Sequence, residues 1–185
     1  MAKKIWKIIS WILLVLTVLS LVLMLVPPSG ANSAADPAAA QSFDGKLAEL
    51  ASTHQRGEAG EARLTEAEVD SKVQQMFAGA PASGVATVSG LAVHLDQDQL
   101  VSVLKIKVLA LSLYITLGGK PGIRQGRLDF EVTEVKLGRM PAPASVVSEV
   151  LQEKLRSPEG QEMEAMPDYI TGMRVENGEL VIESK

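Results

Sequence analysis

The hydrophobic pattern of the chain begins with one long apolar run near the N-terminus. Residues 8–26 carry no charged side chain; Lys3, Lys4 and Lys7 precede them, and Pro27 follows. A helix rises about 1.5 Å per residue, so this run would span roughly 28 Å, close to the ~30 Å hydrocarbon core of a bilayer. Residues 1–26 are therefore predicted to form an uncleaved, single-pass transmembrane signal-anchor.

The charges beside this run predict its orientation. The lysines lie on its N-terminal side, and the next basic residue after it is Lys46. Positively charged flanks favour the cytoplasmic side. We therefore expect a cytoplasmic N-terminus and an extracytoplasmic remainder, at the cell membrane of a bacterium. The alternative is a cleaved signal peptide, with small residues for cleavage at 31–35, although the apolar core of such peptides usually spans about 7–15 residues.

Beyond the anchor, the composition divides the chain into two parts. Residues 27–41 are mostly Pro, Ala, Ser and Gly, and residues 43–54 have only a weak helical stripe. Such a stretch has few large apolar side chains to bury. We therefore expect a flexible spacer with a weak helix over residues 27–62 and one extracytoplasmic α+β domain over residues 63–185.

Two stretches of this domain have the period of an amphipathic helix. In residues 64–77, Thr65 and Glu68 match a capping box, and an apolar stripe begins at Val69. In residues 144–155, valines and leucines share one face and acidic side chains the other. Both stretches are predicted helices.

Between them the apolar period changes to two, which is typical of strands. Strands are predicted over residues 91–95, 100–117 and 127–137, with turns at 96–99 and 118–122. The apolar phase shifts once in each of the last two strands. A strand cannot change face without an extra residue, so we expect a bulge or sharp bend near Val108–Leu109.

The end of the chain predicts a hairpin, because Asn177–Gly178 suits a type I′ turn between two apolar strands. The predicted fold class is thus α+β. It comprises an N-terminal transmembrane helix followed by a strongly curved antiparallel sheet packed by two amphipathic helices.

The candidate binding residues are the aliphatic side chains of the long run. Both of its phases carry large aliphatic residues. This pattern fits a central strand covered on both faces, or a curled sheet with an apolar groove for an acyl chain. The residues alone leave both interpretations open. The lipid-groove candidates are Leu104, Ile106, Val108, Leu109, Leu111, Leu113, Ile115 and Leu117.

Composition and charge exclude several classes of function. The net charge of the chain is −4, and the N-terminal lysines leave the exported part more acidic still. An acidic domain does not suit nucleic acid, and its lipid contacts are expected to come from apolar surface instead of charge. The chain has no cysteine, which excludes disulfides, thiol catalysis and Cys-ligated zinc.

Catalytic signatures are weak. Ser102 and Lys105 match a Ser-x-x-Lys pattern that needs a helix, but they lie in a predicted strand. His54 and His94 are predicted to be separate surface side chains. We therefore predict no catalytic residue, no cofactor, no metal and no enzyme activity.

The order of the predicted elements is similar to that of a known protein family. The chain begins with the predicted anchor and the spacer, followed by the helix with the pattern Leu64-Thr65-x-x-Glu68-Val69. Curved strands, an amphipathic helix, a segment that contains Pro167 and a closing hairpin come next. This order resembles the YpmS-like family of bacterial membrane-anchored proteins and, more loosely, LmeA-like periplasmic proteins and tubular lipid-binding (TULIP-like) domains. The resemblance covers about residues 64–183, implies a lipid-binding groove, and brings no catalytic residues.

Two functions follow as hypotheses. The first is an anchored, non-catalytic module of the cell envelope that binds a lipid or acyl chain in an apolar groove. The second is a structural adaptor that tethers an envelope protein partner at the membrane.

Overall fold

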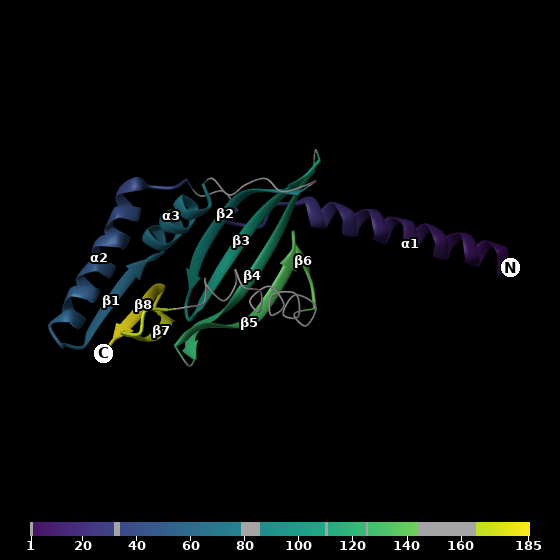
Figure 1. Cartoon of the computed structure of the whole chain (residues 1–185). Helices are drawn as coiled ribbons and strands as arrows, with labels where there is room; N and C mark the ends of the chain where they lie inside the picture. Colours follow the sequence, from purple (N-terminus) through teal and green to yellow (C-terminus); the bar gives the residue numbers. More distant parts are fainter. Residues whose placement is uncertain (1, 32–33, 79–85, 110, 125, 144–165) are drawn as a thin grey trace.

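Figure 1 shows the computed structural model, which describes residues 2–31, 34–78, 86–109, 111–124, 126–143 and 166–185. The class is α+β, as predicted, but the strands form two antiparallel sheets and not one. The elements are α1 (Ala2–Leu25), α2 (Pro37–Gln55), β1 (Gly60–Thr65), α3 (Glu66–Phe77), β2 (Ala86–Asp96), β3 (Gln99–Val108), β4 (Leu111–Arg124), β5 (Arg127–Leu137), β6 (Met140–Pro141), β7 (Ile170–Glu176) and β8 (Glu179–Ser184).

The long sheet has the order β2-β3-β4-β5-β6. The stretch 100–117, predicted as one strand with a bulge or bend, is instead part of a hairpin. β3 ends at Val108, β4 begins at Leu111, and these two residues pair across the hairpin. The apolar phase shifts at Leu109 because the chain reverses there, so the prediction of a bend was wrong.

The turn predicted at residues 118–122 is also wrong, because β4 continues through it to Arg124. Gly119 pairs with Val132 of β5, and the ring of Phe130 lies where a Cβ of Gly119 would be. Here glycine allows close approach of two strands, which is the other common use of this residue.

The phase shift predicted within residues 127–137 is confirmed as a bulge. Gly118 pairs with Glu134 and Gly119 with Val132, so Thr133 is the extra residue of β5. The extra residue keeps the apolar side chains before and after it on the same face. A second irregularity in β2 lies between Val88 and Gly90.

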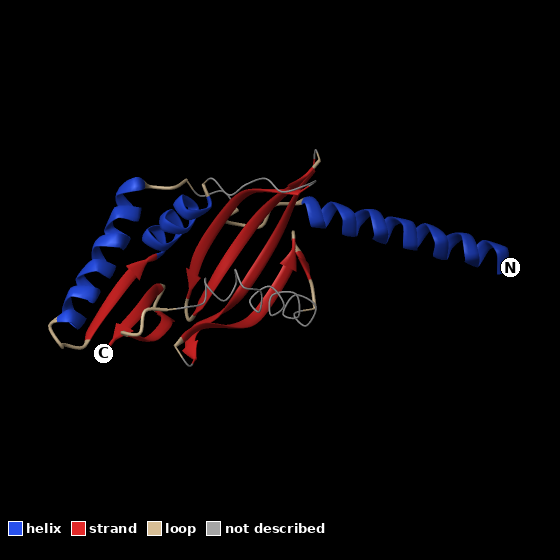
Figure 2. Ribbon diagram, viewed as in Figure 1, coloured by secondary structure: helices blue, strands red, loops and turns tan. Residues whose placement is uncertain are grey.

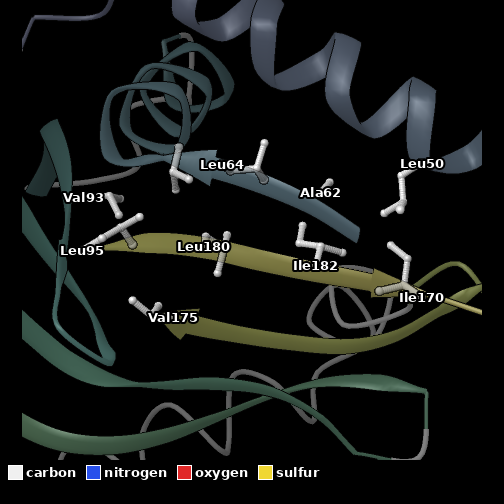
Figure 3. Packing of buried hydrophobic residues seen from close by; sticks show 10 residues of the cluster. Leu50, Ala62, Leu64, Val93, Leu95, Ile170, Val175, Leu180 and Ile182 are labelled. Atoms are coloured by element: carbon white, nitrogen blue, oxygen red, sulfur yellow. The ribbon is translucent and has the colours of Figure 1, made fainter. Parts of the chain in front are cut away.

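The small sheet has the order β1-β8-β7 and closes the chain. β7 and β8 are joined at Asn177–Gly178, whose φ angles of 53° and 78° match the predicted turn. Side chains of α2, β1, α3, β2, β7 and β8 meet in one apolar cluster (Figure 3). Its members are Leu50, Ala62, Leu64, Val69, Val93, Leu95, Ile170, Val175, Leu180 and Ile182.

The helix predicted from the capping box is confirmed as α3. Thr65 and Glu68 exchange both bonds of the box. By contrast, the weak helix expected over residues 43–54 begins earlier, at Pro37, with Asp36 as its N-cap. α2 packs on α3 and β1 and buries Leu50, so the stretch from Pro37 onward is folded where the composition suggested flexible chain.

Helix α1 extends away from one end of the long sheet, whereas α2, α3 and the small sheet lie at the other end (Figure 2). Its last turn is bonded to the sheet: the Arg139 amide donates to the Leu23 carbonyl at 3.0 Å, and the Gly138 amide donates to that of Tyr114 at 2.7 Å. Gly138 has φ +59°, and a Cβ there would overlap the carbonyls of Leu23 and Met24. Only glycine fits at this junction.

The transmembrane span itself is not supported by the described residues. Within the part of the chain whose side chains the structure describes, no helix combines the length and apolar character needed to cross a membrane. The amphipathic helix predicted over residues 144–155 lies outside the described residues.

Candidate functional site

Seven of the eight predicted groove residues lie on one face of the long sheet. The register pairs Leu104 with Ile115, Ile106 with Leu113, and Val108 with Leu111. Directly paired residues of an antiparallel hairpin point to the same side. Leu117 continues the row opposite Ser102. Leu109 is the exception, because it lies in the connection between the strands.

This arrangement changes the meaning of the sequence pattern. The two apolar phases were interpreted as the two faces of one strand. The hairpin brings both phases to one face, which we call the aliphatic face. The other face of the same strands carries Lys105, Lys107, Ser112 and Thr116, among others.

The aliphatic face extends onto the neighbouring strands. Leu91 of β2 pairs with Leu104, and Val135 and Leu137 of β5 pair with Leu117 and Ile115. Because of the bulge at Thr133, the apolar residues Leu128, Phe130 and Val132 continue the same face. The result is a surface of branched and aromatic side chains across β2 to β5.

Burial along the aliphatic face is uneven. At one end Val93 and Leu95 are buried in the cluster shared with the small sheet. At the other end Leu113 is 36% exposed and Leu111 is 56% exposed. Large exposed apolar patches of this kind mark protein, ligand or membrane contacts in soluble domains. This end of the face is therefore the candidate binding surface.

A pocket with both polar and apolar lining lies on the opposite face, under the chain that follows α1. Its volume is about 490 Å³, and its lining includes Gly30, Glu66, His94, Thr116 and Lys136. Thr116 is buried, and its hydroxyl has no hydrogen-bond partner in the described structure. Because this pocket joins residues from six separate segments, no local sequence pattern could have predicted it.

His94 is the central contact of this pocket, and not the separate surface side chain that was predicted. Its Nδ1 lies 3.1 Å from Glu66 Oε1, and its Nε2 lies 3.0 Å from the carbonyl oxygen of Gly30. Both partners are acceptors, and a neutral imidazole has only one N–H. Both bonds form together only when His94 is protonated.

The surroundings favour that charged form. Burial alone lowers the pKa of His94, but the bonds to Glu66 and Gly30 and the charges of Glu66 and Asp70 outweigh it and raise this pKa. Burial likewise raises the pKa of Glu66, but the bond from the Leu95 amide and the interaction with His94 lower it overall. His94 thus connects the chain after α1 to the domain in a pH-dependent way.

We expect this contact to weaken as the pH rises. A raised folded-state pKa gives stabilisation that is complete below about 6.5 and is lost as the pH rises through the folded value. Because the pair is partly exposed, the effect should stay below about 1 kcal/mol. The protection of the amides of residues 29–31 against hydrogen exchange, relative to the intrinsic rate at each pH, should fall across this range in the native protein. In a His94→Ala variant the protection should be low throughout, whereas His54→Ala should retain the pH dependence.

The remaining catalytic candidates are separated by the fold. Ser102 and Lys105 lie three positions apart on β3 and therefore point to opposite faces. His54 stacks on Tyr169 with ring centroids 5.1 Å apart, and its Nδ1 lies 2.7 Å from the Lys185 carbonyl oxygen. In the ranges that the structure describes, no group of three or more His, Asp or Glu residues could hold a metal ion.

Comparison with protein-family models, with curated proteins and with solved structures finds no match to this chain. The resemblance to YpmS-like and TULIP-like proteins therefore stays a prediction.

Proposed function

We propose that this protein is a membrane-anchored, extracytoplasmic and non-catalytic module that holds a lipid or acyl chain against its aliphatic face. The observation that carries the proposal is the convergence of both apolar phases of residues 104–117 on one partly exposed face. Aliphatic side chains without polar groups suit a hydrocarbon chain and offer little to a polar ligand. Transfer of apolar surface from water contributes roughly 25 cal/mol per Å².

The proposed anchor is α1. It is a helix of 24 residues, which at about 1.5 Å per residue is roughly 36 Å long. Its side chains from Trp11 to Leu19 are more than half exposed where they are large and apolar. Exposing them to water would be unfavourable, and the apolar run 8–26 has the length of a bilayer core. The lysines at its start support an extracytoplasmic domain.

The anchor is tested by fractionation and by a reporter. The full chain should remain in membranes after carbonate washing, and a reporter fused at Lys185 should be active only outside the cytoplasm. Release by carbonate, or a reporter active only in the cytoplasm, would overturn the anchor.

Lipid binding is tested with the purified full chain. Organic extraction followed by mass spectrometry should recover a lipid enriched over the bulk membrane lipids, and the protein should take up a fluorescent fatty acid. An extract without enrichment, together with no uptake, would contradict the proposal. A reproducible crosslinked protein partner in intact cells, with no lipid, would favour the adaptor alternative.

The Leu113→Asp substitution places a charge on the aliphatic face and should separate binding from folding. An acyl chain would have to desolvate this carboxylate, so uptake should fall by at least about tenfold. Because Leu113 is 36% exposed, the fold should persist, as checked by circular dichroism. The matched control is Ser112→Asp, the neighbouring residue on the other face, which should retain uptake. Full uptake by folded Leu113→Asp would exclude this face as the binding site.

A further inference from the structure

The connection between β3 and β4 has an unusual residue at a backbone position with positive φ. Leu109 has φ +54° and is 79% exposed. A branched apolar side chain is costly in this left-handed conformation, where Gly, Asn or Asp is usual, and it gains nothing from exposure to water. Among the described residues, Asn177 follows this rule, and Gln97, the third residue other than glycine with positive φ, is at least polar. A strained residue of this kind points to a function.

Other exposed, large apolar side chains lie at the same end of the long sheet as Leu109. Leu111 follows it at 56% exposed, and Val88 on β2, in the row next to Ile106, is 41% exposed. These side chains lie at the end of the long sheet and not in its middle. They form an apolar edge at the strand ends, where the aliphatic face meets the connection between β3 and β4.

This edge lies next to α1. Tyr114 on β4 accepts the hydrogen bond from Gly138, whose neighbour Arg139 donates to Leu23 in the last turn of α1. α1 contacts both β4 and β6. In Figure 1 the joined ends of β3 and β4 lie beside the point where α1 leaves the sheet.

The charge of this end differs from that of the chain. The segments 86–90, 105–109, 111–114 and 138–143 contain no acidic residue, although the whole chain has a net charge of −4. They contain Lys105, Lys107 and Arg139. In the described residues none of these three forms an ion pair, and Lys105 lies over the ring of Tyr114. Cations that are not neutralised by an acidic partner, beside exposed leucines, are typical of surfaces that enter the headgroup region of a bilayer.

We propose that this end of the sheet is a second membrane contact, seated in the headgroup region of the leaflet from which α1 emerges and attracted by anionic lipid. We call it the membrane-proximal tip, and it consists of Leu109, Leu111, Lys105, Lys107 and Arg139. The inference rests on the proposed anchoring by α1. The leucines enter the interface, and the cations meet lipid phosphates. The open end of the aliphatic face then adjoins the bilayer, which supplies its ligand directly.

The test uses the full chain in vesicles of phosphatidylcholine and phosphatidylglycerol that contain a doxyl-labelled lipid. Because the native chain has no cysteine, a single cysteine can carry an environment-sensitive fluorophore. The probe sites are Leu109→Cys and Gln97→Cys, which lie at the two ends of β3 with the same left-handed φ. Ten residues of strand separate them by roughly 30 Å.

Quenching by the doxyl lipid should be at least about threefold stronger at position 109 than at position 97, because only the tip enters the interface. With the probe at Val88→Cys, Leu109→Asp should reduce the quenching, whereas Gln97→Asp should leave it unchanged. Aspartate tolerates the φ of this position better than leucine, so Leu109→Asp should fold. Omission of phosphatidylglycerol from the vesicles should reduce the quenching of the probe in protein with the native lysines. The same omission should reduce the quenching less in the double variant Lys105→Gln/Lys107→Gln.

The outcomes separate this inference from the proposed function. Equal quenching at both sites, weak or strong, in protein that stays in the vesicles after carbonate would overturn the tip and retain the anchor. Protein that leaves the vesicles in carbonate would overturn the anchor and the tip with it. Unchanged quenching in folded Leu109→Asp would also overturn the tip.

Discussion

Leu64→Ala should lower the free energy of unfolding of the domain by about 3–4 kcal/mol, the largest effect expected of any substitution considered. Leu64 is 0% exposed and is one of the largest fully buried side chains among the described residues. It lies on β1 at the centre of the cluster between α2, α3 and the small sheet. Its truncation removes buried methyl groups and leaves a cavity, because the close-packed side chains around it can relax only partly.

Denaturant unfolding of the full chain in mild detergent, followed by circular dichroism, measures this change. The matched control is Leu111→Ala, which removes the same atoms from a side chain that is 56% exposed. That control should stay within about 0.5 kcal/mol of the native protein. Equal effects for the two variants would mean that the core does not centre on Leu64.

Glu68→Gln should have the second-largest effect, about 2–3 kcal/mol of lost stability at neutral pH. The carboxylate of Glu68 is buried, yet it accepts bonds from the Lys46 ammonium at 2.8 Å and from the Thr65 amide at 2.7 Å, and also from the Ser42 and Thr65 hydroxyls. Burial alone would raise its pKa, but these bonds lower the pKa to about 2 from its usual 4.5.

The sign of the pH dependence follows from this lowered pKa. The stabilisation by Glu68 is complete above pH 4.5 and is lost as the pH falls towards about 2. The native protein should therefore lose stability across this acid range, whereas Glu68→Gln should show a flatter profile there. Urea titrations at a series of pH values measure the difference.

The control for this titration is Glu58→Gln, which removes a carboxylate from an exposed ion pair with Arg56. Its effect should be within about 0.5 kcal/mol. If the acid profile of Glu68→Gln matched that of the native protein, another carboxylate would account for the acid sensitivity.

Local signals in the sequence predicted the parts of the fold that depend on neighbouring residues. The capping box at Thr65 and Glu68 and the hairpin at Asn177–Gly178 were predicted because each is a contact between residues close in sequence. The shift of apolar phase within residues 127–137 was visible in the sequence, and it corresponds to the bulge at Thr133, because a change of phase has few structural solutions within one strand.

The errors have a common physical cause. A change of apolar phase at Leu109 fits a bulge or a hairpin equally well, and the usual turn residues that would distinguish them are absent. Gly118 and Gly119 resemble a turn, but they serve the close approach of β5, which only the pairing reveals. The reversal of the chain was therefore predicted at residues 118–122, whereas it lies at Leu109.

The candidate site was predicted as a set of residues but not as a surface. The pattern identified the aliphatic side chains, and only the register between β3 and β4 places them together. The pocket around His94 had no sequence signal, because Gly30, Glu66 and Thr116 approach it from segments far apart in the chain. The basic residues near Leu109 were not apparent from the net charge, because the chain as a whole is acidic.

The bonded junction at Gly138 has a mechanical consequence. A domain on a flexible linker would reach a large volume above the membrane and could carry a bound lipid across the envelope. Here the last turn of α1 is bonded to the sheet through Leu23 and Arg139, and the following chain is held by His94. If α1 crosses the bilayer, the domain pivots and diffuses with it as one body. It would then hold its lipid at a fixed distance from the membrane. The amount of lipid bound would scale with the number of copies per area of membrane, and transfer of that lipid elsewhere would need a separate carrier protein to come to it.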